Sequence, residues 1–370
     1  MLPFSKEIKI IDLPALHAPI KKELDSAISQ VLTHQQFING PELTAFESQL
    51  GNYLNAQVLG VGNGTDALEI ALLALDIKPG DEVLVPSFSY FASAEAVAHL
   101  GAVPVFVDID PRTYIIDIED AALKITSKTK AIIVVHLYGL SADMELILGF
   151  AKANNIKIIE DTAQAIGAEC EVNGEWKKAG TIGDIGCVSF FPSKNLGAFG
   201  DGGAIISTDE NSVEKAKKIA QHGQSKRYSH DFVGMNSRLD TLQAAVLIVK
   251  LKQLDYWTKR RQEIANRYTD KLKNIDGVQP PYVPQNCSHV YHQYTIYVAS
   301  NRDAWLHKLQ ALGVPARLYY PKSIHQQKAF QKISPVSLPV TEQIQSGMLS
   351  LPIHPTMTNE EVDYIIESMR

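Results

Sequence analysis

The sequence predicts an α/β fold: a large domain with a mostly parallel seven-stranded sheet between helices, followed by a small C-terminal α+β domain. In the first 250 residues, short apolar segments alternate with helical segments, which is the pattern of a doubly wound sheet. Several of these segments are uninterrupted apolar runs, as at 131–135 and 156–160, and such runs are typical of strands buried on both faces. The length of 370 residues leaves room for a second, smaller domain.

The elements can be placed in order along the chain. A single long helix is expected over 239–273, and a turn-rich segment after it cannot continue a helix. We therefore assign residues 1–250 to the large domain and 251–370 to the small one. Thr358 and Glu361 have the spacing of a capping box for a last helix. The strands are expected at 57–61, 82–86, 104–108, 131–135, 156–160, 186–191, 203–207 and 291–298, and further helices at 19–33, 41–53, 66–75, 143–154, 301–312 and from 359.

Composition and charge exclude several classes of protein. The net charge of −6 argues against a nucleic-acid binder, which would carry a basic stripe. No apolar run approaches the length of a membrane span, and residues 1–6 do not resemble a signal-peptide core, so we expect a cytoplasmic protein with no membrane partner.

Cysteine, histidine and basic residues give no sign of a metal site. The three cysteines are far apart, which makes a disulfide framework or a zinc site unlikely and favours free thiols. The spacings of the histidines match no ligand pattern, so no metal is expected. A basic cluster on the long helix is expected to face solvent. The residues concerned are Cys170, Cys187 and Cys287; His222, His230, His289, His292 and His325; and Lys252, Lys259, Arg260 and Arg261.

Lys194 is the first candidate for chemistry. It follows an apolar strand and precedes a glycine-dense loop that ends at Gly203. A lysine at the end of a sheet, among small residues, has the space and the desolvation that favour a reactive free amine able to form a Schiff base. The alternative for an isolated lysine is a surface turn, but the flanking sequence favours the reactive role.

Asp161 and a glycine-rich turn extend this site. Asp161 ends an apolar strand, where ligands of open α/β folds bind, and its carboxylate could keep a pyridine nitrogen protonated. Its alternative role is to cap the next helix. Residues 60–67 carry a strand into a helix through glycines, and such a turn binds phosphate. A dinucleotide fingerprint is the rival interpretation, but the acidic pair Asp81 and Glu82 lies at the start of the next strand and not at its end.

A phosphate cradle, a pyridinium carboxylate and a Schiff-base lysine, in this chain order, describe a fold-type I pyridoxal-phosphate enzyme. The sequence also resembles the DegT/DnrJ/EryC1/StrS sugar aminotransferases over nearly its whole length. Four ordered motifs carry the resemblance, at 63–66, 160–164, 189–203 and 236–240. Some members of that family are dehydratases with histidine at the lysine position, and Lys194 favours an aminotransferase here.

The resemblance implies a role for each matching residue. Lys194 would hold pyridoxal 5′-phosphate as a Schiff base and move the proton, and Asp161 would pair with the ring nitrogen. A neighbouring subunit of a homodimer would complete each site. The remaining expected roles are Gln164 at the ring hydroxyl, Tyr90 stacked on the ring, Gly64, Thr65 and Ser189 at the phosphate, Asn236 at the phosphate from the neighbour, and Tyr319 and Tyr320 near the sugar.

Arg238 lies two residues after Asn236, so an extended segment would put both side chains on one face. We therefore expect Arg238 to bind a substrate carboxylate across the dimer interface, since a guanidinium holds a carboxylate through two hydrogen bonds. The alternative is a structural ion pair with Asp240 or another interface carboxylate.

The implied reaction moves the amino group of L-glutamate to a nucleotide-linked keto sugar, giving 2-oxoglutarate. Gln164 stands where many 4-aminotransferases of the family have histidine, which favours C3 of a UDP-sugar made for surface polysaccharide. Within the family the likeness is greatest to aminotransferases of UDP-2-acetamido-2-deoxy-3-oxo-glucuronate, although Tyr319 and Ser323 replace that subgroup's usual histidine and proline. The alternatives are a dTDP-keto-6-deoxysugar 3- or 4-aminotransferase, a nicotinamide-dependent oxidoreductase, and a catalytically silent regulator of the same fold.

Overall fold

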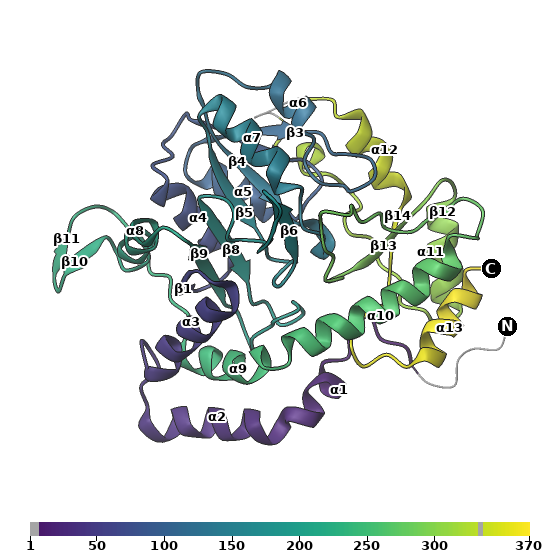
Figure 1. Cartoon of the computed structure of the whole chain (residues 1–370), viewed down its shortest axis with the longest axis horizontal. Coiled ribbons are helices and arrows are strands. Elements are labelled where there is room, and N and C mark those ends of the chain that lie inside the picture. Colours follow the sequence, from purple (N-terminus) through teal and green to yellow (C-terminus); the bar gives the residue numbers. More distant parts are fainter. Residues whose placement is uncertain (1–6, 332–335) are drawn as a thin grey trace.

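A seven-stranded sheet forms the centre of the large domain in the computed structural model, which describes residues 7–331 and 336–370 (Figure 1). The order is β1-β9-β8-β5-β4-β2-β3, and only β9 runs against the other strands. Each predicted strand of this sheet is present within two residues of its expected bounds. The strands are β1 (Gln57–Val61), β2 (Glu82–Pro86), β3 (Val103–Val107), β4 (Thr129–Val135), β5 (Lys157–Asp161), β8 (Ile185–Ser189) and β9 (Gly203–Ser207).

Helices cover both faces of this sheet. They are α1 (Leu13–His17), α2 (Lys21–His34), α3 (Pro41–Leu54), α4 (Gly64–Ala74), α5 (Ala92–His99), α6 (Ile118–Leu123), α7 (Met144–Asn154), α8 (Glu210–Ala220) and α9 (Thr241–Leu251), with short 3-10 turns at Ala18–Ile20 and Leu137–Gly139. Two hairpins interrupt the pattern, β6 (Glu169–Val172) with β7 (Glu175–Lys178) and β10 (Gln224–Lys226) with β11 (Ser229–His230). None of the helices in the described part of the chain is long and apolar enough to cross a membrane.

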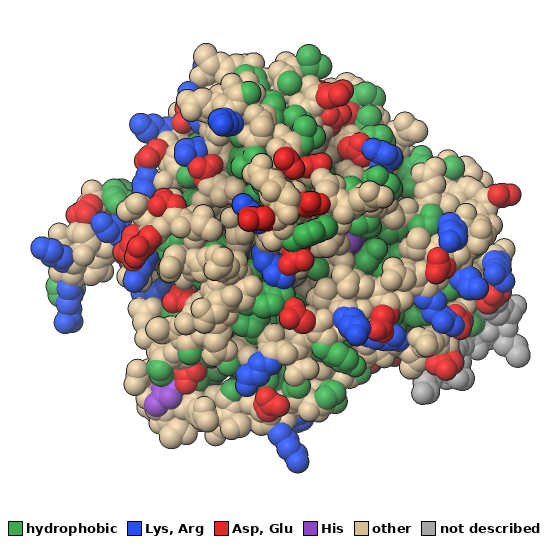
Figure 2. Space-filling view, viewed as in Figure 1, with side chains coloured by type: hydrophobic (Ala, Val, Ile, Leu, Met, Phe, Trp, Pro, Cys, Tyr) green, Lys and Arg blue, Asp and Glu red, His purple; other side chains and the backbone are tan. Residues whose placement is uncertain are grey.

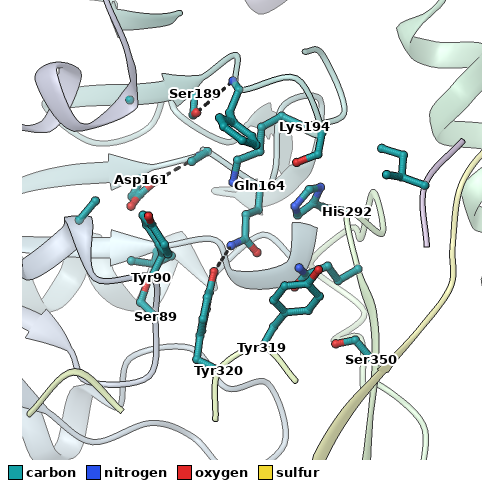
Figure 3. Close-up of a pocket in the computed structure, with 18 of the residues that line it drawn as sticks. Ser89, Tyr90, Asp161, Gln164, Ser189, Lys194, His292, Tyr319, Tyr320 and Ser350 are labelled. Carbon is teal, nitrogen blue, oxygen red and sulfur yellow. Dashed lines mark hydrogen bonds between the residues drawn. The ribbon is translucent and has the colours of Figure 1, made fainter. Parts of the chain in front are cut away.

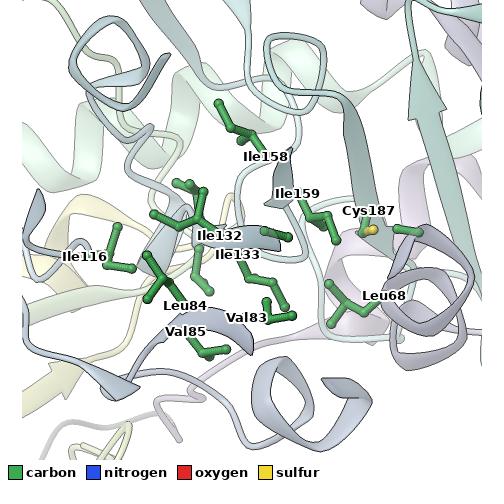
Figure 4. Close-up of a cluster of buried hydrophobic side chains, with 14 of the residues drawn as sticks. Leu68, Val83, Leu84, Val85, Ile116, Ile132, Ile133, Ile158, Ile159 and Cys187 are labelled. Carbon is green, nitrogen blue, oxygen red and sulfur yellow. The ribbon is translucent and has the colours of Figure 1, made fainter. Parts of the chain in front are cut away.

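Successive side chains of β8 and β9 pack into different cores on the two faces of the large sheet. Cys187 and Ile205 point into the main core with α4, whereas Val188 and Ile206 pack with α3 and α9. Successive side chains of a strand point to opposite faces, so a strand that is apolar at every position needs a helical layer on each side. Figure 4 shows the main core, in which residues of β2, β4 and β5 meet those of α4.

The C-terminal part folds around a small antiparallel sheet. Its strands are β12 (Val278–Gln279), β13 (Tyr294–Val298) and β14 (Met348–Leu351), and its helices are α10 (Leu254–Leu272), α11 (Arg302–Ala311), α12 (Pro339–Gly347) and α13 (Asn359–Ser368), with a 3-10 turn at Ile324–Gln326. A second core joins α10, α11 and α13 to this sheet. Thr358 and Glu361 form the predicted capping box at the start of α13. The fold is therefore the large α/β domain with a small α+β domain that the sequence predicts.

One predicted element is wrong in detail. The long helix expected over 239–273 is two helices, because α9 ends at Leu251 and α10 begins at Leu254. The two intervening residues form a turn closed by a bond from the Gln253 N–H to the Lys250 carbonyl, 2.9 Å long. The break lets Leu254 pack with α3 and α9 while α10 leads on to the small sheet. The proposed domain boundary after residue 250 lies one residue before the end of α9 and stays a prediction.

Candidate active site

A cavity of about 650 Å³ lies at the carboxyl edge of the large sheet, where the small domain closes over it. Its lining comes from the ends of β5 and β8, the start of α4, the loop after β2, and residues of β14 on the small-domain side. Figure 3 shows Asp161, Lys194, Gln164, Tyr90 and Tyr320 converging on this space. Parallel strands end at the same edge, which explains why residues far apart in sequence meet here.

Asp161 is buried at the last position of β5. Its carboxylate accepts hydrogen bonds from the Ser93 hydroxyl at 3.0 Å and the Ala163 N–H at 3.1 Å. Burial raises its pKa, while the Ala163 N–H and the charge of Lys194 oppose that shift. The alternative role as a helix cap is wrong, because residues 163–167 form a turn that leads into β6 and no helix follows. The carboxylate is thus presented to the cavity.

Lys194 faces Asp161 from the loop between β8 and β9. Burial lowers the pKa of its amine to about 8, and the negative charge of Asp161 works against that shift. An amine with this pKa is partly unprotonated near neutral pH, which a nucleophile that attacks a carbonyl carbon requires. The lysine is therefore in the electrostatic state that the sequence predicts for it.

The start of α4 offers a site for a phosphate group. Asn63 caps the helix through its side chain and accepts from the Asp66 N–H at 2.9 Å. Gly64 and Thr65 are the first helical residues, so their N–H groups have no partner within the helix and face the cavity with Ser189. A Cβ on Gly64 would lie only 2.8 Å from the Ser189 Cβ, which shows why a glycine stands there. This cradle fits the phosphate of pyridoxal 5′-phosphate.

Three further expected residues line the same cavity beside Tyr90. The Gln164 amide donates to the Tyr320 hydroxyl at 3.0 Å and accepts from the Tyr138 N–H at 2.7 Å, so its orientation is fixed at both ends. The Tyr90 ring is 60% exposed, and its centre lies 6.0 Å from that of Tyr320. Tyr319 lines the cavity on the small-domain side. A flat ligand between Asp161 and Tyr90 would therefore meet Gln164 at its edge.

Asn236 and Arg238 do not line this cavity within the chain. They flank Ser237, which is buried and binds Asp66 at 2.6 Å and the Gly62 N–H at 2.9 Å. Since side chains alternate along an extended segment, Asn236 and Arg238 point to the side opposite the buried Ser237. The alternative partner of Arg238, Asp240, forms no ion pair with it among the described residues. The structure therefore leaves both residues facing away from their own chain's site.

Sequence reasoning missed two residues in the wall of the cavity. His292 is not among the expected site residues, yet it lines the cavity beside Lys194 and contacts Asn195 at 3.2 Å (Figure 3). Arg261 is grouped with an exposed basic cluster, which is wrong because it is 3% exposed and lines the cavity. The helical spacing contains a signal for it, since Arg261 falls on the stripe of Trp257, Ile264 and Tyr268, all buried.

Residues 18–370 match the model of the DegT/DnrJ/EryC1/StrS aminotransferase family, and the chain belongs to that family. A relative from Acidithiobacillus ferrooxidans, UDP-N-acetyl-3-dehydro-alpha-D-glucosamine 3-aminotransferase, is 43% identical over 98% of this chain and 97% of its own length. The UDP-2-acetamido-2-deoxy-3-oxo-D-glucuronate aminotransferase of Pseudomonas aeruginosa is 42% identical over 98% of this chain and 99% of its own.

Solved structures agree with this assignment. An aminotransferase of the same family from Brucella abortus has a TM-score of 0.93 at 40% identity, with 98% of both chains covered. The ntda protein of Bacillus subtilis with bound cofactor PMP has a TM-score of 0.88 at 33% identity, covering 100% of this chain and 86% of the other. The protein is a pyridoxal-phosphate-dependent aminotransferase, which excludes the nicotinamide-dependent alternative.

The lowered pKa of Lys194 predicts how the reactivity of its amine depends on pH. In the cofactor-free protein, acylation of Lys194 should follow the unprotonated amine and reach half its maximal rate near pH 8. Asp161→Asn should move this midpoint to lower pH, because the carboxylate stabilises the ammonium form. Asp201→Asn, which removes another carboxylate from the cavity lining, should leave the midpoint in place. Peptide mass spectrometry across a pH series measures all three, and an unchanged midpoint in Asp161→Asn would contradict the pairing.

Proposed function

We propose that the enzyme transfers the amino group of L-glutamate to C3 of a UDP-linked keto sugar used for surface polysaccharide. The observation that carries this proposal is the 42–43% identity, over almost the full chain, to two relatives whose names specify UDP-linked 3-oxo sugars. Gln164, the residue on which the C3 assignment from the sequence depends, lines the cavity and is held at both ends by hydrogen bonds.

The residues of the chain have distinct tasks in this reaction. Bound pyridoxal 5′-phosphate supplies an electron sink through its protonated ring. Asp161 holds the proton on the ring nitrogen, and its buried hydrogen bonds keep the carboxylate in place. Lys194, with its lowered pKa, would act as the general base that takes the proton from the carbon bearing the donor's amino group. We assign Gly64, Thr65 and Ser189 to the phosphate, Tyr90 to stacking, Gln164 to the ring hydroxyl, and Tyr319 and Tyr320 to the sugar.

We also propose a homodimer with shared active sites. Asn236 and Arg238 face away from their own cavity, which supports a role in a neighbour's. The hairpin β10–β11 just before them projects from the body, and Figure 2 shows basic side chains at its tip. Tyr228 is 83% exposed and Val233 is 96% exposed on this projection. Apolar side chains held out in this way favour burial against a partner.

Arg238 is our candidate for a substrate carboxylate across that interface. A guanidinium holds a carboxylate through two parallel hydrogen bonds, and both L-glutamate and a uronic acid sugar carry such a group. A cytoplasmic location is a further proposal, supported by the three cysteines, which are all free thiols.

The substrate assignment predicts a particular product. With L-glutamate as donor, the enzyme should aminate a UDP-linked 3-keto sugar, or run in reverse from the 3-amino sugar if the ketone is unstable. Nuclear magnetic resonance of the product should place the nitrogen on C3. Faster turnover of dTDP-keto-6-deoxysugars, or nitrogen on C4, would favour the alternative substrates. No turnover of any keto-sugar nucleotide would overturn the proposed class of acceptor.

The shared-site proposal predicts that an impaired variant and an inactive variant complement each other in a mixed dimer. Arg238→Ala should weaken glutamate use by about 1.5–3 kcal/mol, the scale of a hydrogen bond to a charged group, without changing cofactor binding. Lys194→Ala should be inactive. Mixing the two variants should restore one complete site per heterodimer, measured as activity against mixing ratio. If both variants form dimers and exchange subunits but the mixture is no more active than its Arg238→Ala content accounts for, the sites are not shared.

A further inference from the structure

Arg261 is a buried cation in the cavity wall, and none of the described acidic residues forms an ion pair with it. Its guanidinium donates through Nη1 to the carbonyls of Tyr291 at 3.2 Å and Ile353 at 2.8 Å. The ion pairs of arginine found in the described part of the chain do not include it. Two carbonyl dipoles compensate only part of the cost of removing a full charge from water. The site is thus stabilised by any anion that reaches it.

The surroundings of Arg261 favour a small anion. Ile10, Ile11, Leu351 and Ile353 line the cavity with Arg261, and apolar surroundings strengthen a charged contact. Burial lowers the pKa of Arg261 only to about 10, so the side chain stays charged at neutral pH. Its hydrogen bonds in the described structure both use Nη1. The Nε and Nη2 edge is the one that pairs side-on with a carboxylate.

His292 lines the cavity together with Arg261 and Lys194. Burial, then Lys194, then Arg261 hold the pKa of His292 well below its usual range, so this histidine is neutral and adds no competing charge. Since all three residues line one cavity, a ligand that reacts at Lys194 shares its space with the Arg261 guanidinium. The nucleotide end of a sugar substrate is long and must extend toward solvent, away from a buried wall.

We propose that Arg261 binds a carboxylate of the amino donor from within the same chain. The inference deepens the proposed function, since it takes L-glutamate as the donor. Glutamate carries two carboxylates, and Arg238 of a neighbouring subunit accounts for at most one of them. Arg261 would then hold the donor in the first half-reaction and release this contact when the keto sugar replaces it. The residue would be a determinant of donor specificity.

The test compares the two half-reactions in single turnovers of the cofactor-loaded enzyme, followed by absorbance. The probes are L-glutamate, L-alanine and a UDP-linked 3-amino sugar. Arg261→Gln should lower the rate constant per molar donor by roughly 10- to 100-fold, the factor expected for a lost charge-assisted hydrogen bond, and should leave the amino sugar within about twofold. If the rate constant falls with both L-glutamate and L-alanine, Arg261 binds the α-carboxylate of the donor. If it falls with L-glutamate alone, Arg261 binds the γ-carboxylate.

Arg260→Gln is the matched control. Arg260 lies on the same helix and also donates to a carbonyl of the C-terminal segment, that of Met357 at 2.9 Å, but it does not line the cavity. It should change neither half-reaction. If Arg261→Gln does not fold, Arg261→Lys decides, because it keeps the charge but loses the planar two-donor edge and should still slow the donor selectively.

Three outcomes would overturn the proposal. Equal donor rates in wild type and both Arg261 variants would show that no carboxylate binds there. If the rate constants for donor and amino sugar fall equally, Arg261 has a structural role only, in which it joins α10 to the segments at Tyr291 and Ile353. A loss confined to the amino sugar would assign Arg261 to the nucleotide. Failure of the wild type to react with glutamate is a different result, because it refutes the proposed donor.

Discussion

Two opposite charges held out of water at the carboxyl edge of the sheet determine what the rest of the site can do. Burial works against both, since it raises the pKa of Asp161 and lowers that of Lys194. Each charge partly restores the ionised form of the other, and Ser93 and the Ala163 N–H add hydrogen bonds to the carboxylate. Asp161 is therefore a carboxylate that can keep a ring nitrogen protonated, and Lys194 is an amine that can lose its proton near neutral pH.

A lowered pKa does not by itself make a catalytic lysine. Lys250 on α9 is 1% exposed, and burial lowers its pKa to about 8, the same value as for Lys194. Lys250 lies 5.6 Å from the Phe199 ring centre and does not line the cavity. Lys194 differs from Lys250 in its surroundings. It faces a carboxylate, and a phosphate cradle at the start of α4 lines the same cavity. Function comes from this arrangement and not from desolvation alone.

The sequence predicts the parts of the fold and site that depend on local pattern. Strand positions follow from apolar runs, and Gly64, Asp161 and Lys194 could be placed at one edge because parallel strands end together. The break before Leu254 could not be foreseen, since no glycine or proline marks it and tertiary packing decides it. Arg261 was assigned to the surface from its charged neighbours, although its helical stripe is buried. The hydrogen bond from Gln164 to Tyr320 joins segments far apart and has no local signal.

The most direct test of the account is the identity of the lysine that carries the cofactor. Borohydride reduction of the loaded enzyme, followed by digestion and mass spectrometry, fixes the cofactor to the side chain that holds it. The account predicts the reduced cofactor on the peptide that contains Lys194. Recovery on Lys250, which has the same lowered pKa but no cradle, or on any other lysine, would contradict it.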